Sequence, residues 1–363
     1  MASVHQIVII GASFGGIPVA HGLLKDVLPG LSADGKAYKV TLLSPSLYFW
    51  WKIGAPRVIV NPKSIPTEKA LLPIADGFKS YSPEQYSFVQ GTVTSIQPAT
   101  KTLQLKSPLP DSSNFSLGYD TLIIASGTSF ASPVWSVTTG SDDLTAALKD
   151  LQDRIPTAQS ILVAGGGAVG VETTGELGEL YGGKKEITLI SGSSALLSRL
   201  KNKKVGADAE NRLQKMGVTV INNGIKVDKV TKEGDKEVLQ LSDGTTKTVD
   251  VYINATGDKP NTAFVPQEWL NERRFVKTDP QTLRLDVPEV TGVYCIGSVA
   301  SYSNGSIMDS LYALKPLLES IKLDLKGESR SISSNMQGSS LMSIQNQGRD
   351  PRTCTRKFRA TCS

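Results

Sequence analysis

One stretch constrains the fold of this chain more than any other: residues 160–180, SILVAGGGAVGVETTGELGEL. The apolar run Ile161–Ala164 predicts a buried strand, and a helical pattern follows the glycines. Between them, Gly165, Gly167 and Gly170 have the GxGxxG spacing. In that context the first glycine makes the turn, the second admits a pyrophosphate, and the third lets the helix pack on the strand. The stretch predicts a dinucleotide site at a helix N-terminus, with a plain strand-to-helix turn as the alternative.

A second glycine-rich loop lies near the start of the chain. The β-branched residues 5–10 predict a strand, and the sequence GASFGG follows it. Gly11, Gly15 and Gly16 are the glycines of this loop, and Ser13 takes the middle fingerprint position. Serine carries a Cβ, so it hinders the close approach of a phosphate to the backbone without blocking it. The loop predicts a second dinucleotide site.

The strand after each loop ends without the acid that binds the ribose hydroxyls in such sites. Residues 39–43 predict a strand that runs into Ser44, a neutral and weaker partner. Residues 186–190 predict a strand that runs into the sequence SGSS at 191–194. Cations follow, which favours NADPH over NADH because a 2′-phosphate needs a positive partner, although a solvated basic helix start has the same composition. These cations are Arg199, Lys201, Lys203 and Lys204.

The two halves of the chain repeat one order: strand, glycine loop, helix, strand, meander, strand and an A-x-G turn. The two turns are residues 125–127 and 255–257. This order predicts an α/β fold of two Rossmann-like three-layer nucleotide-binding domains with β-meander crossovers. The strands expected in the first half are 87–96, 101–106 and 120–125, and 108–118 is expected to be a loop. In the second half a meander is expected at 218–220, 226–231 and 238–241, followed by a strand at 250–255; the expected helices are 144–154 and 204–216.

The last part of the chain rejoins the first half in character. Residues 292–296 predict a strand, in which Cys295 is expected to be a core residue, and residues 310–325 predict a helix. Residues 331–363 are rich in Ser, Asn, Gln, Gly and Arg and contain few apolar side chains. Their composition predicts a disordered or loosely attached basic tail.

Composition narrows the class of protein. The 363 residues have a net charge of +5, most of it beyond residue 330, so the nearly neutral body argues against a nucleic-acid partner. The three cysteines make neither a disulfide framework nor a zinc site, so we expect no metal and a reducing, cytoplasmic setting. No apolar run reaches the roughly 18 residues of a spanning helix. The start, MASVHQIVII, lacks the basic region of a signal peptide.

Residues 48–60, YFWWKIGAPRVIV, have an unusual composition, with aromatic and basic side chains between two prolines. One interpretation is a hydrophobic plug over the edge of a sheet. The other is the wall of a pocket for a flat ring, with Lys52 and Arg57 reaching a cofactor or substrate.

Five motifs together resemble those of the two-dinucleotide flavoproteins. This family includes pyridine-nucleotide disulfide reductases, type II NADH dehydrogenases and proteins similar to apoptosis-inducing factor, and the likeness is greatest to fungal oxidoreductases of that last group. The resemblance implies a glutathione-reductase-like architecture, with FAD on the first loop and the last motif and NAD(P)H on the central loop. The motifs, in the family's order, are GASFGG at 11–16, IIASGT at 123–128, GGGAVGVE at 165–172, NATGDKPN at 254–261 and GVYCIGSVAS at 292–301.

The resemblance also implies domains and site residues. It implies an FAD-binding domain of residues 1–130 and 258–330 and an NAD(P)H-binding domain of residues 131–257. In related flavoproteins an acid at the position of Glu172 pairs with a lysine near the flavin, which makes Glu172 and Lys52 the candidate catalytic residues, with Arg57 as the second choice of partner. The implied cofactor-binding residues are Gly11, Ser13, Gly15, Gly16, Ser44, Lys52, Arg57, Gly127, Gly165, Gly167, Gly170, Gly257, Gly297 and Ser298.

The chain departs from the family in four places. Residues 17–60 contain no cysteine, which excludes the disulfide reductases with their redox cysteine pair after the first helix. The membrane-binding C-terminal helix of type II NADH dehydrogenases has no visible counterpart. Ser298 stands where the family has an aspartate that contacts FAD. The family's closing interface segment has no match beyond about residue 330, and a homodimer is left open.

Two classes of function follow from these residues. The first is an FAD-dependent NAD(P)H oxidoreductase that passes hydride from nicotinamide to flavin, and electrons on to a quinone or another small molecule, including one of secondary metabolism. The cofactor supplies the chemistry, so a chain with only two histidines suffices. The second is a non-catalytic nucleotide-binding or signalling protein with a weakened flavin site, which the serines at 13, 44 and 298 favour.

Overall fold

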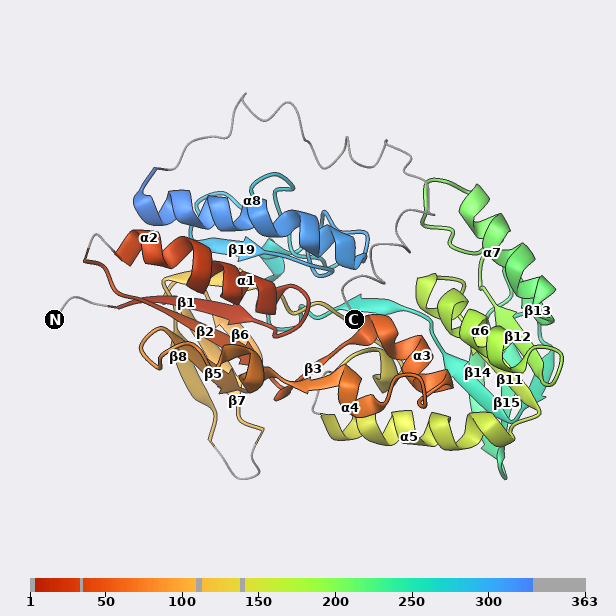
Figure 1. Cartoon of the computed structure of the whole chain (residues 1–363). Coiled ribbons are helices and arrows are strands. Elements are labelled where there is room, and N and C mark those ends of the chain that lie inside the picture. The colour runs from red at the N-terminus through yellow and green to blue at the C-terminus, as the bar shows by residue number, and fades with distance from the viewer. Residues whose placement is uncertain (1–3, 33–34, 109–112, 138–140, 329–363) are drawn as a thin grey trace.

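The computed structural model describes residues 4–32, 35–108, 113–137 and 141–328, so the tail predicted at 331–363 lies outside the described residues. The chain forms two lobes side by side, one built from its first and last parts and the other from its middle (Figure 1). Each lobe contains a parallel sheet between a layer of helices and a three-stranded meander. The predicted α/β fold with two three-layer units is confirmed.

The parallel sheet of the first lobe has the order β19-β9-β1-β2-β5. Alternate side chains of β1 enter two different cores: Ile7 and Ile9 pack on the helices, whereas Val8 and Ile10 pack toward the meander. Its strands are β1 (His5–Ile10), β2 (Tyr38–Ser44), β5 (Tyr86–Gln90), β9 (Thr121–Ile124) and β19 (Val293–Cys295); its helices are α1 (Gly16–Gly22), α2 (Leu28–Ser32) and α8 (Ile307–Lys326), with a π-helical turn at Leu23–Val27.

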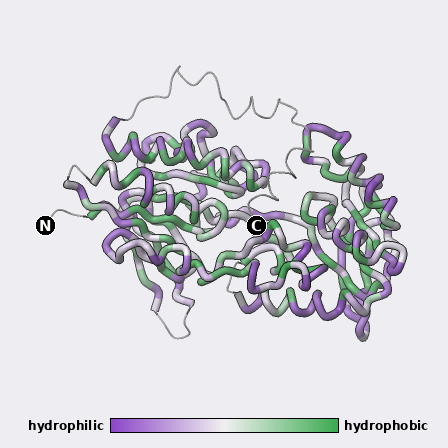
Figure 2. Tube along the Cα trace, in the orientation of Figure 1, coloured by the Kyte–Doolittle hydropathy of each residue, from purple (hydrophilic) through white to green (hydrophobic). Residues whose placement is uncertain are grey.

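The second lobe repeats this plan with the order β13-β12-β11-β17. Ile161 and Val163 of its central strand pack toward the helices, and Leu162 and Ala164 pack toward the meander. The hydrophobic residues of both lobes gather along the strands and the inner faces of the helices (Figure 2). The elements are β11 (Ser160–Ala164), β12 (Glu186–Ile190), β13 (Val218–Ile221), β17 (Val251–Asn254), α5 (Ser141–Thr157), α6 (Ala168–Tyr181) and α7 (Lys204–Lys215).

The meanders correct three sequence-based predictions. Residues 108–118 were expected to be a loop, yet Phe115–Gly118 forms the third meander strand of the first lobe. Residues 218–220 were expected in the second meander, but they pair in parallel with β12. The third strand of that meander is Thr246–Val249, which the prediction lacked. The full meanders are β6 (Thr92–Gln97), β7 (Thr102–Lys106) and β8 (Phe115–Gly118), and β14 (Val227–Glu233), β15 (Lys236–Leu241) and β16 (Thr246–Val249).

Two further expectations change in length. The single strand expected at 87–96 is divided at Gly91, so that β5 joins the parallel sheet and β6 begins the meander. The helix expected at 144–154 extends over Ser141–Thr157. Cys295 is fully buried, as predicted, and burial raises the pKa of its thiol to about 12.

Residues 48–73 extend from the first lobe onto the second (Figure 1). Trp50, Val58 and Ile59 share one hydrophobic core with Leu148 of α5 and Leu177 of α6. The structure thus supports the interpretation of this stretch as a hydrophobic plug, with the lobe junction rather than a sheet edge beneath it. Its elements are β3 (Tyr48–Trp50), a 3₁₀ turn (Lys52–Gly54), α3 (Ala55–Val60), α4 (Thr67–Ala70) and β4 (Leu71–Pro73).

A short antiparallel ribbon also crosses between the lobes. It pairs β10 (Thr128–Phe130), which leaves the first lobe, with β18 (Asp258–Pro260), which returns to it. Because the chain passes between the lobes at two neighbouring strands, the A-x-G turns of both lobes lie at the ends of this ribbon.

Replacing Gly170 by alanine should destabilise the protein, because a Cβ there would lie 1.8 Å from the carbonyl oxygen of Gly165. Overpacking of this kind costs about 1–3 kcal/mol. Gly175 on the same helix is the control, since a Cβ there meets nothing within 4 Å and Gly175→Ala should stabilise α6. Thermal unfolding of both variants checks the prediction, and equal midpoints would contradict it.

Candidate active site

The central glycine loop connects β11 to α6 at the carboxyl end of the parallel sheet. Gly165 has a φ of +126°, and a Cβ on it would lie 2.5 Å from the carbonyl oxygen of Ala255. Gly170 leaves no room for a Cβ either, because it packs on Gly165. Gly167 differs from both, because a Cβ on it would meet nothing within 4 Å. Gly165 and Gly170 are therefore closely packed against neighbouring backbone, whereas the space beside Gly167 is open.

The first loop repeats this geometry between β1 and α1. Gly11 has a φ of +108°, and a Cβ on it would lie 2.3 Å from the carbonyl oxygen of Ala125. A Cβ on Gly16 would lie 1.8 Å from the carbonyl oxygen of Gly11. Gly11, Ser13 and Gly16 thus occupy the places of Gly165, Gly167 and Gly170, as the duplication predicted.

The geometry of these two loops fits the phosphates of a dinucleotide. The helix N-terminus after Gly167 presents backbone N–H groups that have no partner within the helix. The space above Gly167 is open, so a pyrophosphate can approach the backbone there. At the first loop Ser13 is only partly buried, so its hydroxyl remains accessible beside the corresponding helix start.

The A-x-G turns face the two loops from the neighbouring strands. Gly127 and Gly257 have φ values of +68° and +65°. Asn261 ties the first turn to the return of the chain, because its side-chain amide donates to the carbonyl of Ser126 at 2.9 Å and its backbone N–H donates to the carbonyl of Gly127 at 3.0 Å. Asn261 lies in the motif NATGDKPN, but the sequence did not predict this role for it.

Ser44 and Ser298, which replace two expected acids, have different surroundings. Ser44 is buried, and its hydroxyl accepts a hydrogen bond from the backbone N–H of Ser46 at 3.2 Å. Ser298 follows Gly297, whose φ is +90°, at the carboxyl end of β19. Its hydroxyl lies 3.2 Å from the hydroxyl of Thr128, beside the A-x-G turn of the first lobe.

Lys52 is partly buried in the turn between β3 and α3. Burial lowers the pKa of its amine, and the negative charge of Asp258 opposes that shift. Asp258 belongs to β18 of the ribbon, so the charge that acts on Lys52 comes from the crossing between the lobes. Asp258 lies in the same motif, NATGDKPN, but the sequence did not predict that it acts on Lys52.

The expected pairing of Glu172 with Lys52 or Arg57 is wrong. Among the described residues, no ion pair of Glu172 forms with either cation; Arg57 instead holds Glu176 in a two-pronged contact, with Nε 3.0 Å from both carboxylate oxygens and Nη2 2.7 Å from Oε1. Glu176 lies one helical turn beyond Glu172 on the same helix, so Arg57 contacts the next acid along α6 and not the predicted one. Partial desolvation, followed by the charge of Glu176, raises the pKa of the Glu172 carboxyl.

The ion pair between Arg57 and Glu176 joins the lobes at α6. Helix α3 carries Arg57 and packs on α6, whose first turn follows the central glycine loop. Glu172 and Glu176 therefore lie on one helix that begins at the central glycine loop, and the contact with Arg57 joins this helix to α3. This arrangement can hold a dinucleotide at the junction with one acid and one partly buried lysine near it.

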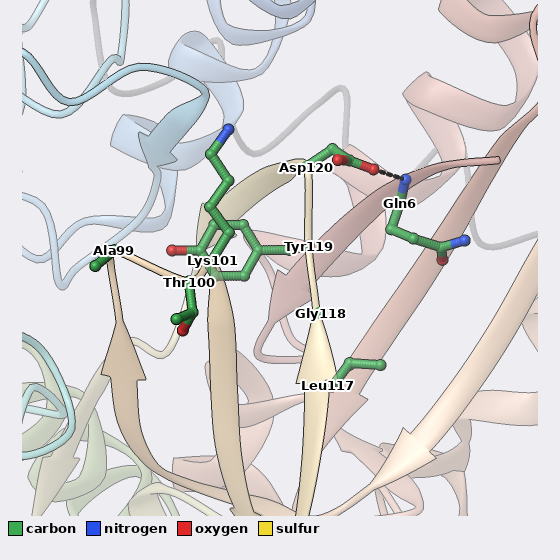
Figure 3. A pocket seen from close by; sticks show the side chains of 8 residues that line it. All are labelled: Gln6, Ala99, Thr100, Lys101, Leu117, Gly118, Tyr119 and Asp120. Carbon is green, nitrogen blue, oxygen red and sulfur yellow. Dashed lines mark hydrogen bonds between the residues drawn. The ribbon is translucent and has the colours of Figure 1, made fainter. Parts of the chain in front are cut away.

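A hollow in the described part of the molecule lies away from these residues. It has a volume of about 640 Å³ and is lined by residues such as Gln6, Lys101 and Asp120 (Figure 3). The carboxylate of Asp120 accepts a hydrogen bond from the backbone N–H of Gln6 at 2.7 Å. Gln6 lies near the amino end of β1, opposite the glycine loops, so this hollow is not the dinucleotide site.

No helix within the described ranges combines the length and the apolar composition needed to cross a membrane.

Comparisons with known proteins agree with the fold and the motifs. The family model of the pyridine nucleotide-disulphide oxidoreductases matches residues 5–317. Oxidoreductase ptaL of Pestalotiopsis fici is 39% identical over 81% of this chain and 77% of its own length. Apoptosis-inducing factor 1 of Saccharomyces cerevisiae is 26% identical over 82% of this chain and 74% of its own length.

Solved structures show the same fold at lower identity. The reduced CoADR-RHD protein of Bacillus anthracis is 18% identical with a TM-score of 0.68, over 91% of this chain and 58% of that one. This chain thus spans less than two thirds of the length of that structure. Because the family model covers most of the chain, the chain belongs to the pyridine nucleotide-disulphide oxidoreductase family, whose members are oxidoreductases that use FAD and NAD(P)H.

Proposed function

We propose that this protein is an FAD-dependent oxidoreductase that takes hydride from NAD(P)H and passes electrons to a small-molecule acceptor such as a quinone or a secondary metabolite. The observation that carries the proposal is the repeated glycine loop, with matching backbone contacts in both lobes. In this proposal residues 1–130 and 258–330 bind FAD, and residues 131–257 bind NAD(P)H. Family membership favours an enzyme over the non-catalytic alternative.

The residues of the chain bind and orient the two cofactors. FAD, when bound, supplies the redox chemistry by accepting hydride. Gly11, Ser13, Gly15 and Gly16 would hold its phosphates, while Gly127, Gly297 and Ser298 lie at the turns that would face its other end. Ser44 would contact the ribose. Gly165, Gly167, Gly170 and Gly257 would hold the nicotinamide dinucleotide.

Lys52 and Glu172 have complementary places in this proposal. Lys52 supplies a cation close to the ribbon, which would stabilise negative charge on a flavin bound there. Glu172 lies in the first turns of α6, from which a carboxylate can orient the carboxamide of nicotinamide. Arg57 acts indirectly, because its contact with Glu176 fixes α6 against α3.

We also propose a preference for NADPH, although some of the cations on which this preference rests already have partners in the structure. Arg199 forms an ion pair with Asp258 at 3.1 Å, and the amine of Lys203 donates to the carbonyl of Ser198 at 2.6 Å. Arg199 and Lys203 are thus already engaged with neighbouring groups. We therefore expect only a severalfold preference for NADPH.

The proposed function is tested by the spectrum and the reduction kinetics of the purified protein. A flavin spectrum, bleached by NADPH without oxygen and restored by a quinone, is the expected result. Stopped-flow traces with NADPH and NADH measure the preference. A protein that remains colourless after incubation with FAD would overturn the proposal in favour of a non-catalytic role.

Glu172→Gln should slow flavin reduction about tenfold while FAD stays bound, because the amide cannot replace a carboxylate that orients the nicotinamide. The control is Glu179→Gln, which removes an exposed acid from the same helix. Stopped-flow reduction of both variants checks this prediction. If both reduce at the wild-type rate, Glu172 only stabilises the start of the helix.

Ser298→Asp should tighten FAD severalfold. A carboxylate accepts stronger hydrogen bonds than a hydroxyl, by about 1 kcal/mol, and Thr128 already lies within hydrogen-bond distance of this side chain. Titration of the apoprotein with FAD measures the change, and Ser116→Asp on the exposed strand β8 serves as the control. Weaker FAD binding by Ser298→Asp would show that Ser298 does not face the flavin.

A further inference from the structure

A second cavity, of about 420 Å³, opens where the loop after β12 meets the chain that returns to the first lobe. Its walls come from Arg199, from β18 and from the turn at residues 273–275. None of the residues of the glycine loops or of the sequence 191–194 lines it. The cavity is thus a separate feature beside the proposed dinucleotide site, and its volume falls in the range of small-molecule sites.

The charge of this cavity is strongly unbalanced. Four cations line it, Arg199, Lys259, Arg273 and Arg274, against the single acid Asp258. Asp258 is already neutralised by Arg199 at 3.1 Å. Among the described residues, no carboxylate lies within ion-pair distance of the other three cations. These three side chains are exposed to solvent, so each of them is available to attract an anionic ligand.

The turn that carries two of the arginines is held by its own hydrogen bonds. The side-chain oxygen of Asn271 accepts from the backbone N–H groups of Arg273 and Phe275, each at 3.0 Å. Thr262 donates to the carbonyl of Arg274 at 2.9 Å. Arg274 has a φ of +64°, a conformation that a non-glycine residue adopts at a cost. The backbone that presents both guanidinium groups is therefore preorganised.

The cavity also offers an apolar surface. The guanidinium of Arg273 lies over the ring of Phe275, 5.3 Å from its centroid. Stacking restricts the side chain and leaves the N–H edge of the guanidinium free to bind an oxyanion in two-pronged fashion. The volume exceeds that of a simple inorganic ion, so the site suits an organic molecule.

We propose that this cavity binds a small organic anion with phosphate or carboxylate groups, at a site distinct from the dinucleotide sites. Arg273 and Arg274 provide the main contacts, Lys259 adds a positive charge, and Phe275 covers the carbon skeleton. Arg199 of the second lobe and Asp258, which form an ion pair, also line the cavity. An occupant would contact both lobes at once.

The proposal is tested by isothermal titration of the FAD-loaded full-length protein with citrate and with pyrophosphate, as carboxylate and phosphate probes, at constant ionic strength. At least one probe should bind with a Kd below about 1 mM. Arg273→Gln and Arg274→Gln should each weaken that binding about tenfold. Asp258→Asn should tighten it severalfold, because the variant removes the only acid and releases Arg199.

Arg212→Gln is the matched control, since it removes an exposed arginine on α7 that does not line the cavity. If Arg212→Gln binds the probe as tightly as the wild type, the result supports a specific site. If it weakens binding as much as the two cavity variants do, the losses come from the change in overall charge, and the proposal is overturned. Absence of binding by both probes at about 5 mM would also overturn it. Displacement of the probe by NADPH but not by NADH would identify the cavity as part of the dinucleotide site instead. Thermal melts confirm that each variant is folded.

Discussion

Close contact between two stretches of backbone determines the architecture of both lobes. In each lobe a glycine in the left-handed region touches the carbonyl of the A-x-G turn on the neighbouring strand, at Gly11 and Ala125 and again at Gly165 and Ala255. The helix that follows can begin at the sheet edge only because Gly16 and Gly170 lie against those same loops. A side chain at any of these positions would push the helix away from the sheet. The position of each phosphate-binding helix start therefore depends on contacts that only glycine permits.

The junction between the lobes rests on the same helix. Helix α6 begins at the central glycine loop, carries Glu172 in its first turns, and receives Arg57 of α3 at Glu176. The apolar side of α3 and Trp50 fill the space beneath this contact, so the ion pair is supported by a shared hydrophobic core. An ion pair with partial exposure contributes little to stability by itself. The ion pair mainly orients the side chains of Arg57 and Glu176, because a two-pronged arginine contact fixes the direction of both.

The sequence predicted an element correctly where that element buries many apolar side chains. The central strands of both parallel sheets, β1 and β11, are apolar on both faces and were found, as was the duplication of the glycine loops. The outer strands were predicted less well, because β5 was joined to β6 and β13 was assigned to the meander. The last strand of each meander was missed, because Phe115–Gly118 and Thr246–Val249 are largely exposed and short, which removes the hydrophobic alternation. Glu172 was predicted to pair with Lys52 or Arg57, yet Arg57 contacts Glu176 one turn further along α6. Spacing along a helix does not determine which acid a distant arginine reaches. The basic cavity joins residues about 75 positions apart, and no local pattern reveals it.

Of the three serines at the first nucleotide site, Ser44 and Ser298 stand in place of acids and remove negative charge, whereas Ser13 stands in place of a glycine and leaves the charge unchanged. Ser13 occupies the middle of a loop whose flanking glycines keep their backbone contacts. Ser44 is held by the chain itself, through Ser46, and Ser298 lies beside Thr128 at the end of β19. Backbone N–H groups at a helix start do not depend on any of these side chains. A site that keeps its backbone geometry and loses carboxylates should bind the same cofactor less tightly, which is a difference of affinity and not of chemistry. The serines are therefore compatible with an oxidoreductase, and they do not by themselves favour a protein that has lost its flavin.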